Sequence, residues 1–127
     1  MTIASLEHVN FTVSDPLKTA NMLCDLFGWH IRWQGVGMQT GQTFHVGTDD
    51  AYVAVFSYSE AKKPSDNSYK TIGGLNHIGV VVDDLDAVEA HVKTMGFTPT
   101  NHGDYEPGRR FYFHDHDDIE FEVISYA

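Results

Sequence analysis

The chain has 127 residues, of which 42% are hydrophobic and 20% are charged, a composition typical of one folded domain and not of a disordered or collagen-like chain. Its 18 acidic residues against 8 Lys and Arg give a net charge of −10, which repels phosphate backbones and anionic lipid surfaces. We therefore expect neither a nucleic acid nor a membrane as a partner.

The cysteine content and the N-terminal residues bear on the cellular compartment. Cys24 is the only cysteine and has no partner for an internal disulfide, and residues 1–5 lack the basic start and the apolar stretch of a signal peptide. No apolar run approaches the roughly 18 residues that a membrane-spanning helix needs. The sequence therefore predicts a cytoplasmic protein.

The first half of the chain predicts one strand, one helix and three further strands. Apolar and polar residues alternate over 6–14, and Asp15 followed by Pro16 is typical of a helix N-cap with proline at the first helical position. Apolar residues then recur at helical spacing until Gly28, which ends the helix. Three strands are expected to follow, at residues 29–33, 42–47 and 51–58.

A polar stretch over residues 60–74, which ends in Gly73 and Gly74, predicts an exposed linker. The second half repeats the order of the first, with a strand over 75–82 and a helix whose apolar stripe begins at Leu85. Three strands are again expected, at residues 97–101, 109–114 and 119–126. We interpret the chain as a single domain, 1–127, with one module at about 5–59 and a second at about 75–127.

An internal repeat relates the two halves. Residues 6–9 recur as 75–78, an offset of 69 residues, and the same offset places Phe44–His45 on Phe113–His114. The fold class predicted from this repeat is α+β, with two βαβββ modules related by a pseudo-twofold axis.

His8 and His77 occupy equivalent positions in the first strand of each module. Apolar residues alternate with them on the face where the helix is expected to pack, so both imidazoles are predicted to point to the opposite, concave face. The last strand carries Glu120 and Glu122 on one face. Two imidazoles and one carboxylate suit Fe(II), and they are also compatible with Mn(II), Ni(II), Co(II) or Zn(II).

Two segments resemble the vicinal oxygen chelate superfamily of glyoxalases, bleomycin-resistance proteins, fosfomycin-resistance enzymes and extradiol dioxygenases. Residues 75–85 (LNHIGVVVDDL) are similar to the start of the family's second module. Residues 111–118 (FYFHDHDD) are similar to its aromatic strand and Asp-Pro-Asp-Gly turn, although His116 and Asp118 replace the Pro and the Gly. The resemblance implies a curved mixed sheet of two half-barrels around a central cleft, a small-molecule substrate and, commonly, a homodimer.

What the resemblance implies for the site is a divalent metal ion held by His8, His77 and Glu122. Glu120 is expected to be a solvated residue, with support of a ligand as the alternative. The offset of 69 puts Val53 where glyoxalase I-type enzymes would carry a fourth ligand. A three-ligand site leaves coordination positions open, which favours a dioxygenase-like reaction over a glyoxalase-like lyase or isomerase step.

Other residues are weaker candidates for the site. We expect Tyr105 and His114 in proton transfer, Arg109 in anion contact, and Val53, Phe56 and Phe113 in the wall of the substrate cleft. The Asp and His residues of 114–118 are expected to form a turn and not a second metal site. Two alternative functions stay open: a non-catalytic bleomycin-resistance-type protein that binds a drug or a small aromatic metabolite, and a degenerate family member that serves as an interaction domain.

Overall fold

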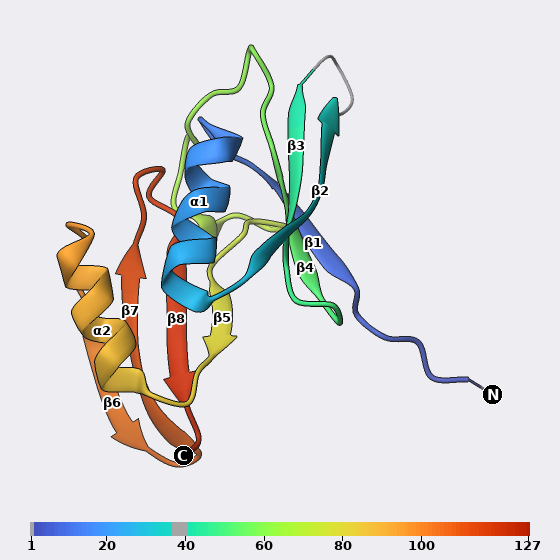
Figure 1. The fold of residues 1–127 in the computed structure, drawn as a ribbon. Helices are drawn as coiled ribbons and strands as arrows, with labels where there is room; N and C mark the ends of the chain where they lie inside the picture. Colours follow the sequence, from blue (N-terminus) through green and yellow to red (C-terminus); the bar gives the residue numbers. More distant parts are fainter. Residues whose placement is uncertain (1, 37–40) are drawn as a thin grey trace. The chain divides into compact units, whose positions relative to one another are not determined.

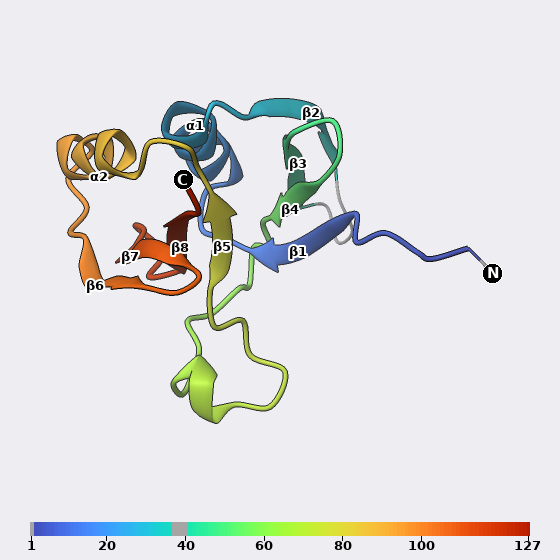
Figure 2. The same ribbon diagram turned by 90° about the horizontal axis from the view of Figure 1, so that it is seen from below.

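A computed structural model describes residues 2–36 and 41–127 of the chain (Figures 1 and 2). The chain divides into two compact units, Met1–Lys62 and Lys63–Ala127. Each unit contains a strand, an α-helix and three further strands, which confirms the predicted pair of βαβββ modules and the α+β class. None of the helices in the described part of the chain is long and apolar enough to cross a membrane.

Unit 1 is a four-stranded sheet covered on one face by a helix (Figure 2). The strands follow one another across the sheet in the order β1-β4-β3-β2, with β1 parallel to β4 and the other pairs antiparallel. The elements are β1 (His8–Thr12), α1 (Pro16–Phe27), β2 (His30–Val36), β3 (Gln42–Gly47) and β4 (Tyr52–Phe56).

Unit 2 repeats this arrangement, with strand order β5-β8-β7-β6 and β5 parallel to β8. A short 3-10 helix in the linker, η2, precedes β5 along the chain. The elements are η2 (Ser68–Lys70), β5 (Ile78–Val81), α2 (Leu85–Thr94), β6 (Thr100–Tyr105), β7 (Gly108–His114) and β8 (Glu120–Ser125).

Local sequence signals set the ends of both α-helices. The Asp15 side chain accepts a hydrogen bond from the Lys18 backbone N–H at 3.2 Å and caps α1. The Asp84 side chain accepts a hydrogen bond from the Ala87 backbone N–H at 3.0 Å and caps α2. Gly28 adopts φ = 69°, the left-handed conformation that ends α1. The caps predicted for the first module are thus confirmed, and the second module uses the same device.

Strand β6 starts later than predicted, at Thr100, and extends through a glycine-containing stretch to Tyr105. The polar composition of this stretch is typical of a loop, but β7 supplies its pairing partners. Gly103 lies opposite Arg110, and Asp104 lies opposite Arg109, so pairing with β7 holds the segment in the extended conformation.

The core of each unit lies between its sheet and its own helix. In unit 2, four side chains of β7 and β8 are fully buried on this face: Phe111, Phe113, Phe121 and Val123. The other face of each sheet carries the alternate residues of the same strands. We call it the open face of that unit.

Candidate metal site

The open face of unit 2 carries the two carboxylates of β8. Glu120 and Glu122 are half-buried, whereas Phe121 and Val123, which alternate with them, are buried in the core. Strand register places Tyr112 and Gly79 directly beside Glu122. The predicted two-carboxylate face of the last strand is therefore the open face.

His77 and Glu122, two of the three predicted ligands, contact each other on this face. The distance between His77 Nε2 and Glu122 Oε1 is 3.2 Å. Gly79 lies next to the pair on β5, and a Cβ built there would come within 3.9 Å of Glu122 Oε1. The chain thus places one imidazole nitrogen and one carboxylate oxygen together, with only a glycine beside them on β5.

Arg110 fixes the orientation of the Glu122 carboxylate. Its Nη1 donates a hydrogen bond to Glu122 Oε2 at 2.9 Å, and both side chains are largely buried. The guanidinium also lies over the ring of Tyr105, 4.7 Å from the centroid. Because Arg110 occupies Oε2, the carboxylate presents Oε1 to His77.

Tyr69 connects His77 to the second carboxylate of the strand. The Tyr69 hydroxyl donates a hydrogen bond to Glu120 Oε1 at 2.5 Å, and the Tyr69 hydroxyl oxygen lies 3.0 Å from His77 Nδ1. The bond to the Glu120 carboxylate, followed by burial, raises the pKa of Tyr69 to about 12. The hydroxyl therefore keeps its single hydrogen, which is directed at Glu120.

Counting hydrogens along this chain of contacts assigns the tautomer of His77. Since the Tyr69 hydrogen is used on Glu120, the Tyr69 oxygen accepts from His77 Nδ1–H. In the neutral ring, Nε2 then carries a lone pair that faces Glu122 Oε1 at 3.2 Å. Two acceptors at this distance require a proton or a cation between them, so the donor set fits a divalent metal ion.

Tyr69 was not predicted as a site residue, since the linker read as a polar connection. Its backbone N–H donates to the Asn67 side chain at 2.8 Å, which caps η2. An aromatic residue within a polar linker was the available signal. Glu120, expected to be solvated, is only 13% exposed in its side chain and supports His77 through Tyr69, the alternative considered from sequence.

The third predicted ligand, His8, lies on the open face of unit 1. Its Nδ1–H donates to Glu7 Oε1 at 2.8 Å, and the Tyr52 hydroxyl donates to the same oxygen at 3.2 Å. These hydrogen bonds, from His8 first and then from Tyr52, lower the pKa of Glu7. Because an ionised carboxylate only accepts, His8 carries its hydrogen on Nδ1, as His77 does, and its Nε2 is the nitrogen suited to a metal.

Aromatic rings continue from His8 across the open face of unit 1. The ring centroids of His8 and Tyr52 lie 4.8 Å apart, those of Tyr52 and His45 lie 4.6 Å apart, and Trp33 is 4.9 Å from His45. Burial, followed by the nearby His8 and Arg32, lowers the pKa of His45 and favours its neutral form. We call these four side chains the aromatic row.

Strand register corrects the residue predicted in the fourth ligand position. Gly79 pairs with Glu122 in unit 2, and its counterpart Asn10 pairs with Ala54 in unit 1. Ala54, not Val53, is therefore the structural counterpart of Glu122. The offset is 68 residues at this strand, since the turn between β7 and β8 differs in length from the turn between β3 and β4. The fourth position still carries an apolar side chain.

The same register corrects three other predictions. His45 pairs with Ala54 and Tyr112 pairs with Glu122, so His45 corresponds to Tyr112 and not to His114. Val53 is 7% exposed and pairs with Val9 and Val46 on the core side, and Phe113 is fully buried. Neither Val53 nor Phe113 lines the open face as predicted, because their strand positions turn them toward the helix.

The other weaker candidates divide between the two faces. Phe56 lies on the open face of unit 1, in register with Thr12. Tyr105 is exposed and stacks with Arg110, and His114 Nε2 lies 3.6 Å from Glu120 Oε2.

Arg109 turns toward the helix and pairs with Asp86 of α2 at 3.3 Å. The Arg that reaches the open face is its neighbour Arg110, which strand alternation could have indicated.

Residues 115–119 form the turn predicted for this segment, and His114 is the last residue of β7. Asp115 Oδ1 accepts hydrogen bonds from the Asp117 N–H at 2.9 Å and from the Ile119 N–H at 3.0 Å. Within residues 2–36 and 41–127, no three His, Cys, Asp or Glu side chains are grouped so as to hold a metal ion. His77 and Glu122 supply two ligands within unit 2, and the participation of His8 stays a prediction.

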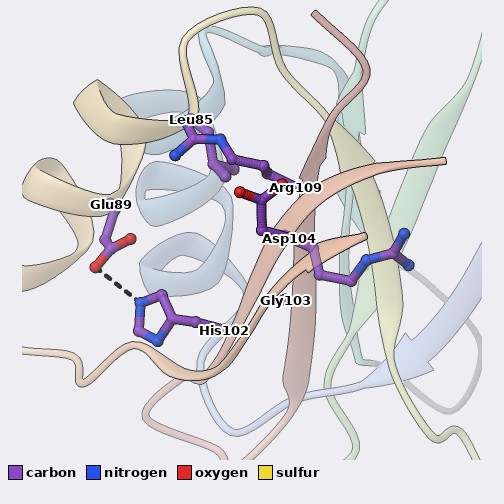
Figure 3. A pocket seen from close by; sticks show the side chains of 7 residues that line it. Leu85, Glu89, His102, Gly103, Asp104 and Arg109 are labelled. Carbon is purple, nitrogen blue, oxygen red and sulfur yellow. Dashed lines mark hydrogen bonds and ion pairs between the residues drawn. The ribbon is translucent and has the colours of Figure 1, made fainter. Parts of the chain in front are cut away.

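A hollow of about 220 Å³ lies between α2 and β6 of unit 2 (Figure 3). His102 and Glu89 point toward each other across it, with Nε2 and Oε2 3.0 Å apart. The hydrogen bond from His102 lowers the pKa of Glu89 against the opposing effect of burial. The hollow is lined by Leu85, Glu89, His102, Gly103, Asp104, Arg109 and Arg110.

The duplicated fold places the chain in the class of two-module α+β proteins. The imidazole–carboxylate pair lies where the divalent-metal site is predicted. Residues 5–123 match the family model described as the Glyoxalase/Bleomycin resistance protein/Dioxygenase superfamily. The chain belongs to this superfamily, which confirms the resemblance seen in the sequence. No curated protein is similar enough to match.

Solved structures of the superfamily share the fold over nearly the whole chain. A glyoxylase/bleomycin resistance protein/dioxygenase domain from Frankia sp. EAN1pec is 19% identical, with a TM-score of 0.81 and 98% of each chain covered. The fosfomycin resistance protein FosX from Mesorhizobium loti is 24% identical (TM-score 0.73; 97% of this chain and 92% of that chain). TnmS3, an antibiotic binding protein from Streptomyces sp. CB03234, is 17% identical (TM-score 0.72; 100% and 99%).

Proposed function

We propose that the protein is a divalent-metal-dependent enzyme that acts on a small substrate through two adjacent oxygen atoms. The observation that carries the proposal is the 3.2 Å approach of His77 Nε2 to Glu122 Oε1, two groups that both act as acceptors in the assigned tautomer. A solved FosX structure from Listeria monocytogenes, 19% identical to this chain, is a complex with Mn(II). Fe(II), Mn(II), Ni(II), Co(II) and Zn(II) all suit nitrogen and oxygen donors of this kind.

In this proposal, His8 and His77 bind the ion through Nε2, and Glu122 binds it through Oε1. Arg110 keeps Glu122 Oε2 engaged, so the carboxylate contributes one oxygen and not two. Ala54 offers no fourth ligand, and this leaves coordination positions for the substrate. The bound ion would act as a Lewis acid toward the paired oxygens of the substrate.

The chemistry then follows one of two routes, and the open coordination positions favour the dioxygenase-like route. His114 and Tyr105 are the proton-transfer candidates, of which His114 lies beside Glu120. Oxygen uptake after anaerobic Fe(II) loading, with catechols as substrates, tests this route. Turnover of methylglyoxal–thiol adducts without oxygen uptake would instead support the glyoxalase-like lyase or isomerase route.

Metal content tests the proposal directly. The metal bound to purified protein is measured by elemental analysis for the wild type and for His8→Ala, His77→Ala and Glu122→Ala. We expect each change to remove the metal, because each deletes one ligand. His102→Ala is the matched control, since His102 lines the hollow between α2 and β6, and it should keep the wild-type content. Unchanged metal in all three variants would refute the assignment.

The aromatic row favours a second candidate function, a non-catalytic binding protein for a flat aromatic molecule. Three stacked rings, those of His8, Tyr52 and His45, and the tilted ring of Trp33 beside them offer an aromatic surface for such a molecule. TnmS3, which shares the fold, is an antibiotic binding protein. Tight binding of an aromatic drug that survives chelator treatment and His77→Ala would support this alternative over the enzyme.

We further propose that the chain works as a homodimer, as the resemblance to small members of the superfamily implies, and that it is cytoplasmic, as its single cysteine indicates. Sedimentation velocity of the purified protein tests the dimer, because a single species of one chain's mass would exclude it.

A further inference from the structure

The linker segment that carries Tyr69 is braced by its own hydrogen bonds. The Asn67 side chain accepts from the Tyr69 N–H, and the Asn67 backbone oxygen accepts from Lys70 N–H at 3.0 Å and from Thr71 Oγ1 at 2.9 Å. The Tyr69 ring is 58% exposed, so it contributes little to the core. The polar contacts of its hydroxyl within unit 2 are the ones with Glu120 and His77.

These contacts form a chain with a defined direction. Glu120 accepts the Tyr69 hydrogen, and the Tyr69 oxygen accepts the His77 Nδ1 hydrogen. His77 Nδ1 also lies 3.5 Å from Glu120 Oε1, too far for a good direct hydrogen bond. Tyr69 therefore bridges the imidazole and the carboxylate.

We propose that Tyr69 is a positioning residue for His77: backed by Glu120, its hydroxyl holds the hydrogen of His77 on Nδ1 and thereby presents the Nε2 lone pair for metal binding. The inference rests on the proposed function, since it takes His77 as a ligand. Partners of this kind orient ligand imidazoles and fix their tautomer in metal sites generally. Here the partner comes from the linker and not from the sheet.

The direction of the hydrogen bonds makes Glu120 the residue that decides the tautomer. If Glu120 is removed, the Tyr69 hydrogen is free to turn toward His77 Nδ1, which then becomes the acceptor. The ring hydrogen moves to Nε2 and blocks the metal-binding nitrogen. Glu120→Ala should thus impair metal binding, whereas Glu120→Gln keeps an oxygen that accepts from Tyr69.

The experiment compares Zn(II) affinity in the wild type, Tyr69→Phe, Glu120→Ala and Glu120→Gln, with Tyr126→Phe as the matched control. Tyr126 is exposed to a similar degree, 61%, and lies at the end of the chain. We expect Tyr69→Phe and Glu120→Ala to weaken Zn(II) binding by about 10-fold or more, in the range typical of such partners. Glu120→Gln and Tyr126→Phe should stay close to the wild type.

A spectroscopic measurement separates positioning from a general structural effect. Proton–nitrogen NMR of the histidine rings in the Zn(II)-loaded protein should show a protected Nδ1 hydrogen on His77. We expect this signal to broaden by exchange with water in Tyr69→Phe, while the backbone spectrum stays that of a folded protein. Retention of both the signal and the affinity in Tyr69→Phe would overturn the inference.

Failure of the proposed function gives a different result. If the wild type binds none of Fe(II), Mn(II), Ni(II), Co(II) and Zn(II), or if His77→Ala binds Zn(II) with unchanged affinity, His77 is not a ligand and both proposals fall. If the wild type and Tyr69→Phe bind equally while His77→Ala does not bind, only the role of Tyr69 is refuted.

Discussion

The two units fold alike, but they hold their histidines in different ways. His8 donates directly to Glu7, its neighbour in the sequence, whereas His77 donates to Tyr69, which in turn donates to Glu120. Both arrangements leave the ring hydrogen on Nδ1. The difference lies in exposure: the carboxylate of Glu7 is 65% exposed and that of Glu120 only 13%. The hydrogen of each imidazole is therefore held on Nδ1 by a neighbour in the sequence in unit 1, and through a contact between residues 51 positions apart in unit 2.

The open faces also differ in what they can bind. Unit 2 carries the Arg110–Glu122 ion pair at the centre of its sheet, whereas unit 1 carries Ala54 at the position equivalent to Glu122. Unit 1 instead has the aromatic row. Both units therefore keep the same frame and a histidine where their first strand begins, His8 as the first residue of β1 and His77 just before β5. The centres of the two sheets differ: unit 2 has a carboxylate there and unit 1 has aromatic rings nearby.

The largest expected effect is on the free energy of unfolding, and it distinguishes the core face of a sheet from its open face. Phe113→Ala should reduce the free energy of unfolding by about 4 kcal/mol, since Phe113 is fully buried and contacts the rings of Phe97 and Phe121. Phe56→Ala, on the open face of unit 1 and only half-buried, is the matched change and should cost clearly less. Urea denaturation measures both. Equal losses would break the assignment of the two faces.

Glu122 tests the asymmetry between the sheet centres. Glu122→Ala should weaken metal binding beyond the roughly 100-fold that loss of an outer partner can cause, because it deletes a ligand. It should also lower Tm, since the largely buried Arg110 loses its carboxylate partner. Glu122→Gln keeps an acceptor for Arg110 and should restore Tm but not metal binding. Metal titration and thermal denaturation separate the two roles; a Gln variant as unstable as the Ala variant would contradict the role of Arg110.

The two histidine partners should differ in strength. Glu7→Gln should weaken Zn(II) binding by less than about 10-fold, and less than Tyr69→Phe does, because Glu7 is exposed and solvent screens its contact with His8. Isothermal titration of both variants ranks them. A larger effect of Glu7→Gln would reverse the comparison between the units.

The smallest expected effect is on the pH dependence of stability, and it comes from the turns between the last two strands of each unit. Burial raises the pKa of Asp115 despite the opposing hydrogen bonds from Ile119 and Asp117. The folded state thus holds the Asp115 proton more tightly than the unfolded state does. The stability that this provides is present below the ordinary Asp pKa and is lost as pH rises through the raised one.

Asp115→Asn should therefore flatten the fall in stability above about pH 4, the ordinary titration range of Asp. The corresponding turn of unit 1 uses the neutral Thr48 hydroxyl as acceptor for the Asp50 N–H, so Thr48→Val is the control and should leave the pH slope unchanged. Urea midpoints measured across this pH range check both. A slope that persists in Asp115→Asn would assign the pH dependence to other carboxyls.

Much of the fold was predictable because its signals are local. The caps at Asp15 and Asp84, the alternation in the strands and the recurrence of 6–9 as 75–78 each depend on a few neighbouring residues. The limits of β6 were not predictable in this way, since its polar residues pair only because β7 faces them. Tertiary pairing overrode the local preference of the segment.

The candidate site was predictable to the extent that the repeat marks it. His77 and Glu122 were found by position and do contact each other. The fourth position was misassigned by one residue, because a constant offset cannot register a turn that changes length. Tyr69 and Arg110 were missed or undervalued, since their roles depend on contacts with Glu120 and Glu122 that no local pattern encodes.

Because Tyr69 precedes β5 along the chain, the functional boundary of the second unit lies before its first strand. A recombinant fragment or a gene fusion cut at residue 75 would include every strand of that half but would leave behind the side chain that orients its histidine. A cut near Lys63, where the compact unit starts, would carry the histidine and its support together. Exchange of halves between relatives should therefore be planned from this earlier point.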